Sequence, residues 1–204
     1  EGPFHGWLIT HGESISLADY LTVKEGGQAK YRPTVHYAYH PCHVAVLSLH
    51  ELAGKNWKIQ KSRRLMMEEI SDGMDELGVL LMGHAKGAYW YGSQLTIEEA
   101  RHCAPHNNAT SLQVTVAVLA GVVWAIENPG RWITDPEEMN FERILEIARP
   151  YLCNMIVTYS DSTPLLDRGL LLDQVLDEEA PWQVTHLRVR LPAVLSSLTH
   201  ISSP

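Results

Sequence analysis

Histidine is the residue type with the clearest capacity for chemistry in this sequence, and the chain has 11 copies. Three of them, His36, His40 and His43, lie close in sequence to two tyrosines and Cys42. Imidazole and thiolate groups are ligands that zinc prefers. However, the spacing matches no established ligand pattern, and a strand over residues 31–39 would place His36 on the face opposite the tyrosines. We therefore expect these histidines to be structural or to contact a substrate, and we predict no metal site.

A second motif combines His11 and Glu13 with Pro41 and Cys42. Zinc-dependent nucleobase deaminases have His-x-Glu followed by Pro-Cys-x-x-Cys, in which the histidine and both cysteines hold the metal. Ala45 stands here where the second cysteine is needed. A zinc-dependent, deaminase-like hydrolase is therefore the alternative function.

A run of acidic residues precedes an aromatic triplet. The run lies within residues 68–76, and the triplet is Tyr89-Trp90-Tyr91. Carboxylates bind ammonium groups, and an aromatic face attracts a cation by about 0.5–2 kcal/mol, depending on desolvation. The two features together could form a diamine site. The structural alternative is a solvated acidic loop followed by a strand that packs both of its faces.

The composition is that of a globular protein with an acidic surface. Of the 204 residues, 45% are apolar and 20% are charged, and 16 basic against 24 acidic side chains give a net charge of −8. This balance argues against a nucleic-acid-binding protein and suits a cationic small molecule. We expect no apolar run to be long enough to cross a membrane, and three cysteines at unrelated spacings favour a reducing, cytoplasmic location. Because the chain begins with Glu1 rather than Met, we expect a fragment or a processed chain.

Periodicity and turn signals predict both strands and helices. Residues 14–23 fit either type, and residues 24–30 should form a turn around two glycines. Thr96 and Glu99 have the spacing of a capping box, and Gly121 suggests close packing of its helix against another element. Because the elements do not alternate strictly, we predict an α+β fold with a mixed sheet and flanking helices. Strands are expected at 4–10, 31–39, 64–70, 79–82, 88–91 and 153–159, and helices at 42–52, 108–127 and 135–149.

Motifs of common cofactor sites are absent from the sequence. No Gly-x-Gly-x-x-Gly follows a predicted strand, and there is no phosphate-binding Walker loop and no Gly-x-Ser-x-Gly nucleophile motif. The residues themselves therefore predict no dinucleotide site.

Five ungapped segments, in the same order from about Gly6 to Val189, resemble bacterial homospermidine synthases. The segments are residues 9–16, 31–34 with 36–42, 72–73 with 75–81, 88–95 and 108–114. The resemblance implies the second half of a saccharopine-dehydrogenase-like fold, whose missing first half is a Rossmann-type domain that binds NAD. We expect residues 1–189 to form a C-terminal substrate and dimerisation domain, and residues 190–204 to be a divergent tail.

The resemblance also implies a reaction. Homospermidine synthases join two putrescines, or putrescine and spermidine, by NAD-dependent aminobutyl transfer, with release of ammonia or diaminopropane. NAD takes a hydride from the carbon that bears an amine, and the hydride is returned after the second diamine has added. The expected partners are putrescine, spermidine, an N-terminal Rossmann half and a second copy in a homodimer, with no nucleic acid and no membrane. We expect the 204-residue chain alone to lack NAD binding and activity.

The candidate site residues follow from this chemistry. An amine must lose a proton before a hydride leaves its carbon, and a histidine at the end of a strand can accept that proton near neutral pH. His11 is the candidate catalytic residue and substrate contact, and Glu13 would orient it or bind ammonium. The other candidate substrate-binding residues are His36, His40, Asp75, Glu76 and Trp90. A non-catalytic dimerisation module remains a further alternative.

Overall fold

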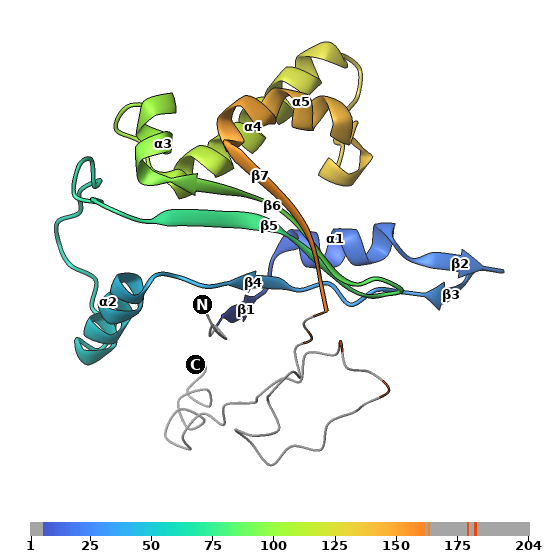
Figure 1. The fold of residues 1–204 in the computed structure, drawn as a ribbon, viewed down its shortest axis with the longest axis horizontal. Helices are drawn as coiled ribbons and strands as arrows, with labels where there is room; N and C mark the ends of the chain where they lie inside the picture. Colours follow the sequence, from blue (N-terminus) through green and yellow to red (C-terminus); the bar gives the residue numbers. More distant parts are fainter. Residues whose placement is uncertain (1–5, 162, 164–178, 180–181, 183–204) are drawn as a thin grey trace, which may run out of the picture. The chain divides into compact units, whose positions relative to one another are not determined.

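The computed structural model describes residues 6–161, 163, 179 and 182, and these form two compact units. The first unit contains the described residues up to 74 and residues 95–153, and the second contains residues 75–94 and the described residues from 154 onward. The α+β class is confirmed, with the strands divided among three small sheets (Figure 1). The predicted tail, residues 190–204, lies outside the described residues.

The first unit begins with two short antiparallel strand pairs. Strand β1 (Trp7–Ile9) pairs with β4 (Tyr37–Tyr39), and β2 (Val23–Glu25) pairs with β3 (Gln28–Tyr31). The turn expected at 24–30 is confined to Gly26 and Gly27, which have φ of 57° and 82°, and the residues on either side belong to β2 and β3. The predicted strand at 4–10 is shorter and is not buried, since Leu8 is 44% exposed.

The first unit has one helix between β1 and β2 and a second helix after β4. The ambiguous segment 14–23 is mainly helical, as α1 (Gly12–Tyr20). The predicted helix 42–52 is α2 (His43–Gly54), which begins after Cys42 and buries none of its residues. Gly54 is the last residue of α2, and Lys55 is its C-cap.

The predicted strand at 64–70 is wrong, because this segment has no regular secondary structure. The carboxylate of Glu69 accepts hydrogen bonds from the backbone amides of Met67 and Glu68 and pairs with Arg64. Backbone hydrogen bonds, followed by the Arg64 guanidinium, lower the pKa of Glu69 to about 2. Side chains that bond locally to the backbone compete with strand pairing, and this explains the irregular segment.

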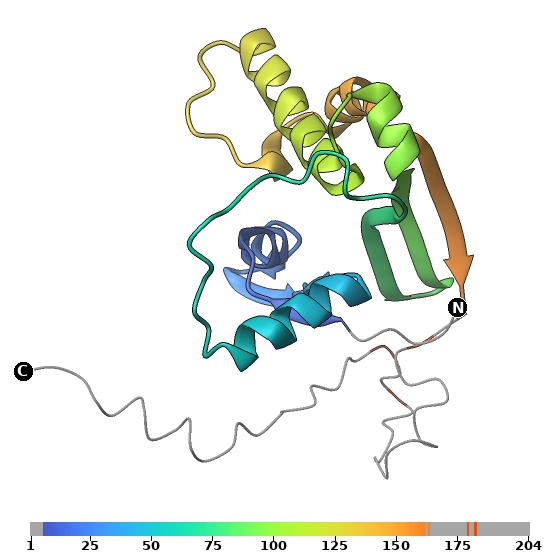
Figure 2. The same ribbon diagram turned by 90° about the vertical axis from the view of Figure 1, so that its left-hand side faces the viewer.

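The core of the first unit is helical. It contains α3 (Ile97–Cys103), α4 (Ala109–Glu127), the short 3-10 helix η1 (Pro136–Glu138) and α5 (Phe141–Leu152), and α4 packs along α5 (Figure 1 and Figure 2). The helix predicted at 108–127 is α4, and Asn108 caps it by accepting a hydrogen bond from the amide of Ser111 at 2.8 Å. The single helix expected at 135–149 is instead divided, because the Asn140 side chain accepts from the Arg143 amide and starts α5 anew. The buried cluster is formed by Leu95, Ala100, Ala109, Leu112, Val116 and Ala148.

Helix α4 corrects the expectation that no apolar run is long enough to cross a membrane. Its 19 residues have a mean hydropathy of 1.8, so by length and composition it could cross a membrane. One face of α4 nevertheless packs in the core just described, as a core helix of a globular protein does. A Cβ at Gly121 would meet no atom within 4 Å, so the expected close packing there does not occur within the described chain.

The predicted capping box at the start of α3 is present. The Thr96 hydroxyl accepts from the Glu99 amide at 3.2 Å, and the Glu99 carboxylate accepts from the Thr96 amide at 2.9 Å. We expect Thr96→Ala to lower the free energy of unfolding by about 1 kcal/mol, because the Glu99 amide loses its acceptor and the Glu99 carboxylate loses the hydroxyl donor. Urea unfolding followed by circular dichroism measures this change. Thr96→Ser keeps the hydroxyl and is the control, and equal losses for both variants would contradict the capping role.

The second unit is a three-stranded sheet in the order β5-β6-β7. Strand β5 (Met74–His84) turns through Ala85 and Lys86 into β6 (Gly87–Thr96), and β6 pairs antiparallel with β7 (Asn154–Ser160). The strands predicted at 79–82, 88–91 and 153–159 are confirmed, and the first two extend well beyond the predicted ranges.

Candidate functional site

The clearest arrangement lies at the sheet formed by β1 and β4, where the predicted residues His11 and Glu13 meet Tyr37, which was not predicted. Antiparallel pairing places Ile9 opposite Tyr37, and His11 follows two residues after Ile9. The His11 ring stacks on the Tyr37 ring, with centroids 4.3 Å apart and planes 15° apart. The Glu13 carboxylate, in the first turn of α1, is hydrogen-bonded to Nδ1 of His11. The imidazole is thus held on one face by an aromatic ring and at one nitrogen by a carboxylate.

This arrangement suits a proton acceptor. A carboxylate only accepts hydrogen bonds, so Nδ1 carries the hydrogen that is donated to Glu13. In the neutral ring Nε2 then has a free lone pair that can take a proton from a substrate. The hydrogen bond from His11 lowers the pKa of Glu13, so the carboxylate stays ionised at neutral pH and stabilises an imidazolium. Both side chains are about half exposed, so a substrate can reach them.

The hydrogen bond between His11 and Glu13 should be visible in the titration of Glu13. We expect His11→Ala to raise the pKa of Glu13 towards its ordinary value, because the main cause of its lowering is removed. An NMR pH titration of the Glu13 side chain measures the shift. His50→Ala, on α2, is the control and should leave the pKa of Glu13 unchanged. An unchanged Glu13 pKa in His11→Ala would show that the hydrogen bond does not persist in solution.

The two weaker candidates, His36 and His40, flank the same sheet. His36 directly precedes β4 and His40 directly follows it, and both are exposed. All four candidates from the first part of the sequence therefore lie at the β1–β4 pair or within a few residues of it.

The other predicted residues, Asp75, Glu76 and Trp90, belong to the second unit. Asp75 is half-buried, and Glu76 is exposed and accepts a hydrogen bond from the Gln94 amide group. A Cβ built at Gly78 or at Gly92 would lie 2.7 Å from Cζ2 of Trp90, so the indole covers two glycines of adjacent strands. This contact gives Trp90 a structural role in the sheet. Its role in substrate binding stays a prediction, as do those of Asp75 and Glu76.

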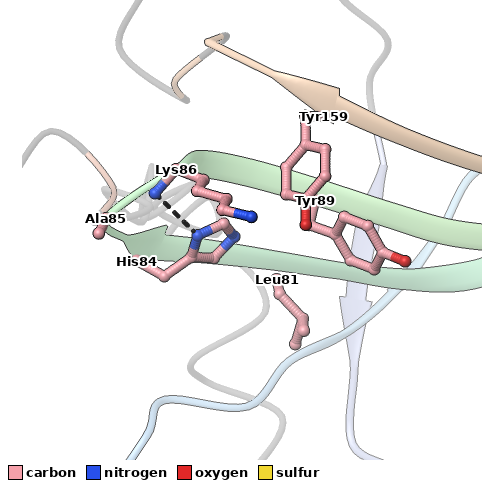
Figure 3. Close-up of a pocket in the computed structure, with 6 residues that line it drawn as sticks. All are labelled: Leu81, His84, Ala85, Lys86, Tyr89 and Tyr159. Carbon is pink, nitrogen blue, oxygen red and sulfur yellow. Dashed lines mark hydrogen bonds between the residues drawn. The ribbon is translucent and has the colours of Figure 1, made fainter.

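The sequence did not single out a pocket at the tip of the β5–β6 hairpin (Figure 3). Its volume is about 380 Å³, and the Lys86 ammonium lies 5.1 Å from the centre of the Tyr159 ring. A cation already lies over this aromatic ring, so the pocket is a poor site for a dicationic diamine. The pocket is lined by Leu81, His84, Ala85, Lys86, Tyr89 and Tyr159.

The arrangement of the described residues does not support the deaminase alternative. Among residues 6–161, 163, 179 and 182, no three His, Cys, Asp or Glu side chains are grouped so that they could hold a metal ion. Cys42 lies at the start of α2, while His11 is engaged with Glu13 and Tyr37.

Comparisons with known proteins agree with the sequence resemblance. The chain is 55% identical over 187 residues to a homospermidine synthase of Blastochloris viridis and 51% identical over 191 residues to one of Mesorhizobium japonicum. The alignments cover 91% and 93% of this chain but only 39% of each relative, so the chain spans about two fifths of their length. A crystal structure of homospermidine synthase from Legionella pneumophila in complex with NAD matches with a TM-score of 0.81 and 55% identity, over 88% of this chain and 39% of that one.

The family model supports the same assignment. The model of the saccharopine dehydrogenase C-terminal domain matches residues 2–157, which include the described residues of the first unit and residues 75–94 and 154–157 of the second. The chain therefore belongs to the saccharopine dehydrogenase C-terminal domain family.

Proposed function

We propose that this chain acts in homospermidine synthesis, as the substrate-binding portion of an NAD-dependent aminobutyl transferase. The reaction joins two putrescines, or putrescine and spermidine, and releases ammonia or diaminopropane. The observation that carries the proposal is the 55% identity to a homospermidine synthase over nine tenths of the chain. The His11–Glu13 pair adds a group of the kind that the reaction needs.

The residues that the structure describes do not form a binding site for NAD. Dinucleotide sites use a glycine-rich turn between parallel strands and a helix N-terminus. The turn from β1 into α1 has only Gly12, and β1 pairs antiparallel with β4. We therefore assign NAD binding to an N-terminal Rossmann-type segment outside this chain, and we derive no step through the cofactor.

The chain's own residues would bind and deprotonate the substrate. Nε2 of His11 takes a proton from a substrate ammonium group, which frees the nitrogen lone pair needed for imine formation. Glu13 keeps the imidazole in the required tautomer and stabilises the positive charge that arrives. Repulsion between a dicationic substrate and the imidazolium is offset by the adjacent carboxylate.

A homodimer and a cytoplasmic location complete the proposal. Support for a dimer comes from apolar side chains that α4 leaves exposed, among them Val118, Val122 and Ile126. Support for a reducing compartment comes from the three cysteines, which are all free thiols. A non-catalytic dimerisation module would share these features, and only a diamine reaction separates the two.

A chimaeric enzyme tests the function. Residues 6–189 would replace the matching segment of the Blastochloris viridis homospermidine synthase, and homospermidine formed from putrescine and NAD would be measured by mass spectrometry. We expect turnover within about tenfold of the parent enzyme, a difference of about 1.4 kcal/mol in the barrier. A chimaera that folds and binds NAD but makes no homospermidine would contradict the proposal. Bound zinc with NAD-independent ammonia release would instead support a deaminase.

The 204-residue chain by itself gives a complementary prediction. We expect it to bind no NAD in a calorimetric titration and to release no ammonia from putrescine with NAD, because the described residues form no dinucleotide site. The chimaera is the positive control for the assay. Ammonia release by the isolated chain, dependent on NAD, would show that this chain holds the cofactor after all.

A further inference from the structure

The two members of the candidate pair are held by different elements of the first unit. The His11 ring follows β1 and stacks on Tyr37 of β4, whereas the Glu13 carboxylate lies in the first turn of α1. Gly12 stands between them, and a Cβ there would meet no described atom within 4 Å. The orientation of α1 therefore decides where the Glu13 carboxylate lies relative to the stacked imidazole.

Helix α1 has little apolar anchoring within the part of the chain that the structure describes. None of its residues is buried. Helices of globular proteins are held mainly by an apolar face packed in a core, and α1 has no such face. An ion pair joins Asp19 to Arg32 at 3.6 Å, but both side chains are exposed, and exposed pairs contribute little. The orientation of α1 must depend on other polar contacts.

One partly buried hydrogen bond ties α1 to the 3-10 helix η1. The Ser16 hydroxyl donates to Oε1 of Glu137, which is 121 residues away in the sequence. A hydrogen bond to an ionised carboxylate is stronger than one between neutral groups. Ser16 follows Glu13 by three residues, so both side chains lie on the same face of α1. The contact therefore holds the face of the helix that carries the orienting carboxylate.

Glu137 is a firm point of attachment. It follows Pro136, whose ring fixes the backbone at the start of η1, and α5 begins shortly after η1 and packs along α4. The second carboxylate oxygen, Oε2, is buried and has no hydrogen-bond partner in the described part of the chain. A buried oxygen without a partner costs stability, and such costs are typical of residues kept for function. Glu137 thus combines a fixed position with a cost that stability alone does not explain.

We propose that Glu137 is a positioning residue of the candidate site. It holds α1 through the Ser16 hydroxyl, and α1 thereby presents the Glu13 carboxylate to Nδ1 of His11. The inference rests on the proposed function, and Glu137 acts in it only through α1. It adds a contact from the segment between α4 and α5 to a site otherwise formed by residues near the start of the chain.

Kinetics of the chimaeric enzyme test this role. We expect Glu137→Ala and Ser16→Ala each to lower kcat/KM by about 10-fold, mainly through kcat, as removal of a residue that orients a functional group does. Glu137→Gln keeps an amide oxygen that accepts from Ser16, so its activity should stay within about threefold of the parent chimaera. Glu138→Ala removes the neighbouring exposed carboxylate of η1 and is the matched control, with unchanged activity.

A double variant separates positioning from a general structural role. If Glu137 acts through Glu13, then adding Glu137→Ala to Glu13→Gln should cause no further loss of activity, because both changes remove the same orienting charge. Losses that multiply in the double variant would overturn the proposal. Equal losses for Glu137→Gln and Glu137→Ala would also overturn it, since the hydrogen bond from Ser16 would then have no effect.

A titration of the 204-residue chain tests the same contact without activity. Glu137→Ala should raise the pKa of Glu13 towards its ordinary value, because the hydrogen bond from His11 is the main cause of its lowering. Glu138→Ala should leave it unchanged. An unchanged Glu13 pKa in a folded Glu137→Ala chain overturns the proposal, and Ser16→Ala, which removes only a hydroxyl, replaces that variant if it fails to fold. An inactive parent chimaera would contradict the proposed function and leave this titration to decide the positioning role.

Discussion

Replacing His11 with glutamine in the chimaeric enzyme is expected to lower kcat/KM for homospermidine formation by about 10²- to 10⁴-fold, the usual contribution of a general base. Glutamine fills a similar space and can still donate a hydrogen bond to Glu13, but it cannot accept a proton at neutral pH. Most of the loss should fall on kcat, because the lost interaction concerns proton transfer more than binding.

The pH profile separates a base from a structural histidine. The chimaera should reach its full activity near neutral pH, because an imidazole can take the proton there. In His11→Gln the substrate amine must lose its proton to water, so activity should keep rising towards a pH of about 10, where alkyl ammonium groups titrate. A variant with uniformly low activity and an unchanged profile would indicate a structural role instead.

Three further variants rank the surrounding residues. Glu13→Gln should cost less than His11→Gln, about 10-fold, since it leaves the base but removes its orienting charge. His36→Gln and His40→Gln should have smaller effects than His11→Gln. If His40→Gln caused the largest loss, the catalytic role would move to the other end of β4.

The sequence predicts best those features whose partners are a few residues apart. The Thr96–Glu99 capping box and the Gly26-Gly27 turn both depend on interactions within a few residues of chain, and both are present. Residues 64–70 have the composition of a strand but no strand as a partner. Instead, backbone amides of this segment donate hydrogen bonds to the Glu69 carboxylate, which prevents strand pairing. Hydrophobic periodicity contains no information about such hydrogen bonds.

In the candidate site, too, contacts between residues close in sequence were predictable, and contacts that depend on strand pairing were not. The proximity of His11 and Glu13 follows from their spacing at the start of a helix. The stacking of Tyr37 on His11 depends on the register of β1 against β4, which joins residues far apart in the sequence, so spacing gave no signal for it. The strand predicted at 31–39 is wrong over 32–36, and only its end forms β4; the pairing of that short strand with β1 was needed to suggest the contact. The packing of Trp90 over two glycines likewise needs the pairing of β5 with β6.

The other large expected effect is a loss of stability when a glycine of the second unit is replaced by alanine. A Cβ at Gly78 would lie 2.6 Å from the Tyr91 carbonyl oxygen and 2.7 Å from Cα of Gly92. These are backbone atoms of the adjacent strand, so they cannot move without disturbing the pairing of β5 with β6. We expect Gly78→Ala to lower the free energy of unfolding by about 1–3 kcal/mol. Urea unfolding of the 204-residue chain, followed by circular dichroism, measures the loss.

Gly121→Ala is the matched control, because the same added methyl group meets nothing within 4 Å. Alanine favours a helix by about 1 kcal/mol over glycine, so this variant should be more stable than the parent.

The double variant Gly78→Ala with Trp90→Ala then identifies which atoms resist the added methyl group. If backbone atoms resist the methyl group, removing the indole restores little stability. If the indole alone resists it, Gly78→Ala should cost less in the Trp90→Ala background than in the parent chain. In that case the Trp90 indole is the group that limits the space above Gly78. An indole packed so closely on the two strands would have little freedom to turn towards a substrate.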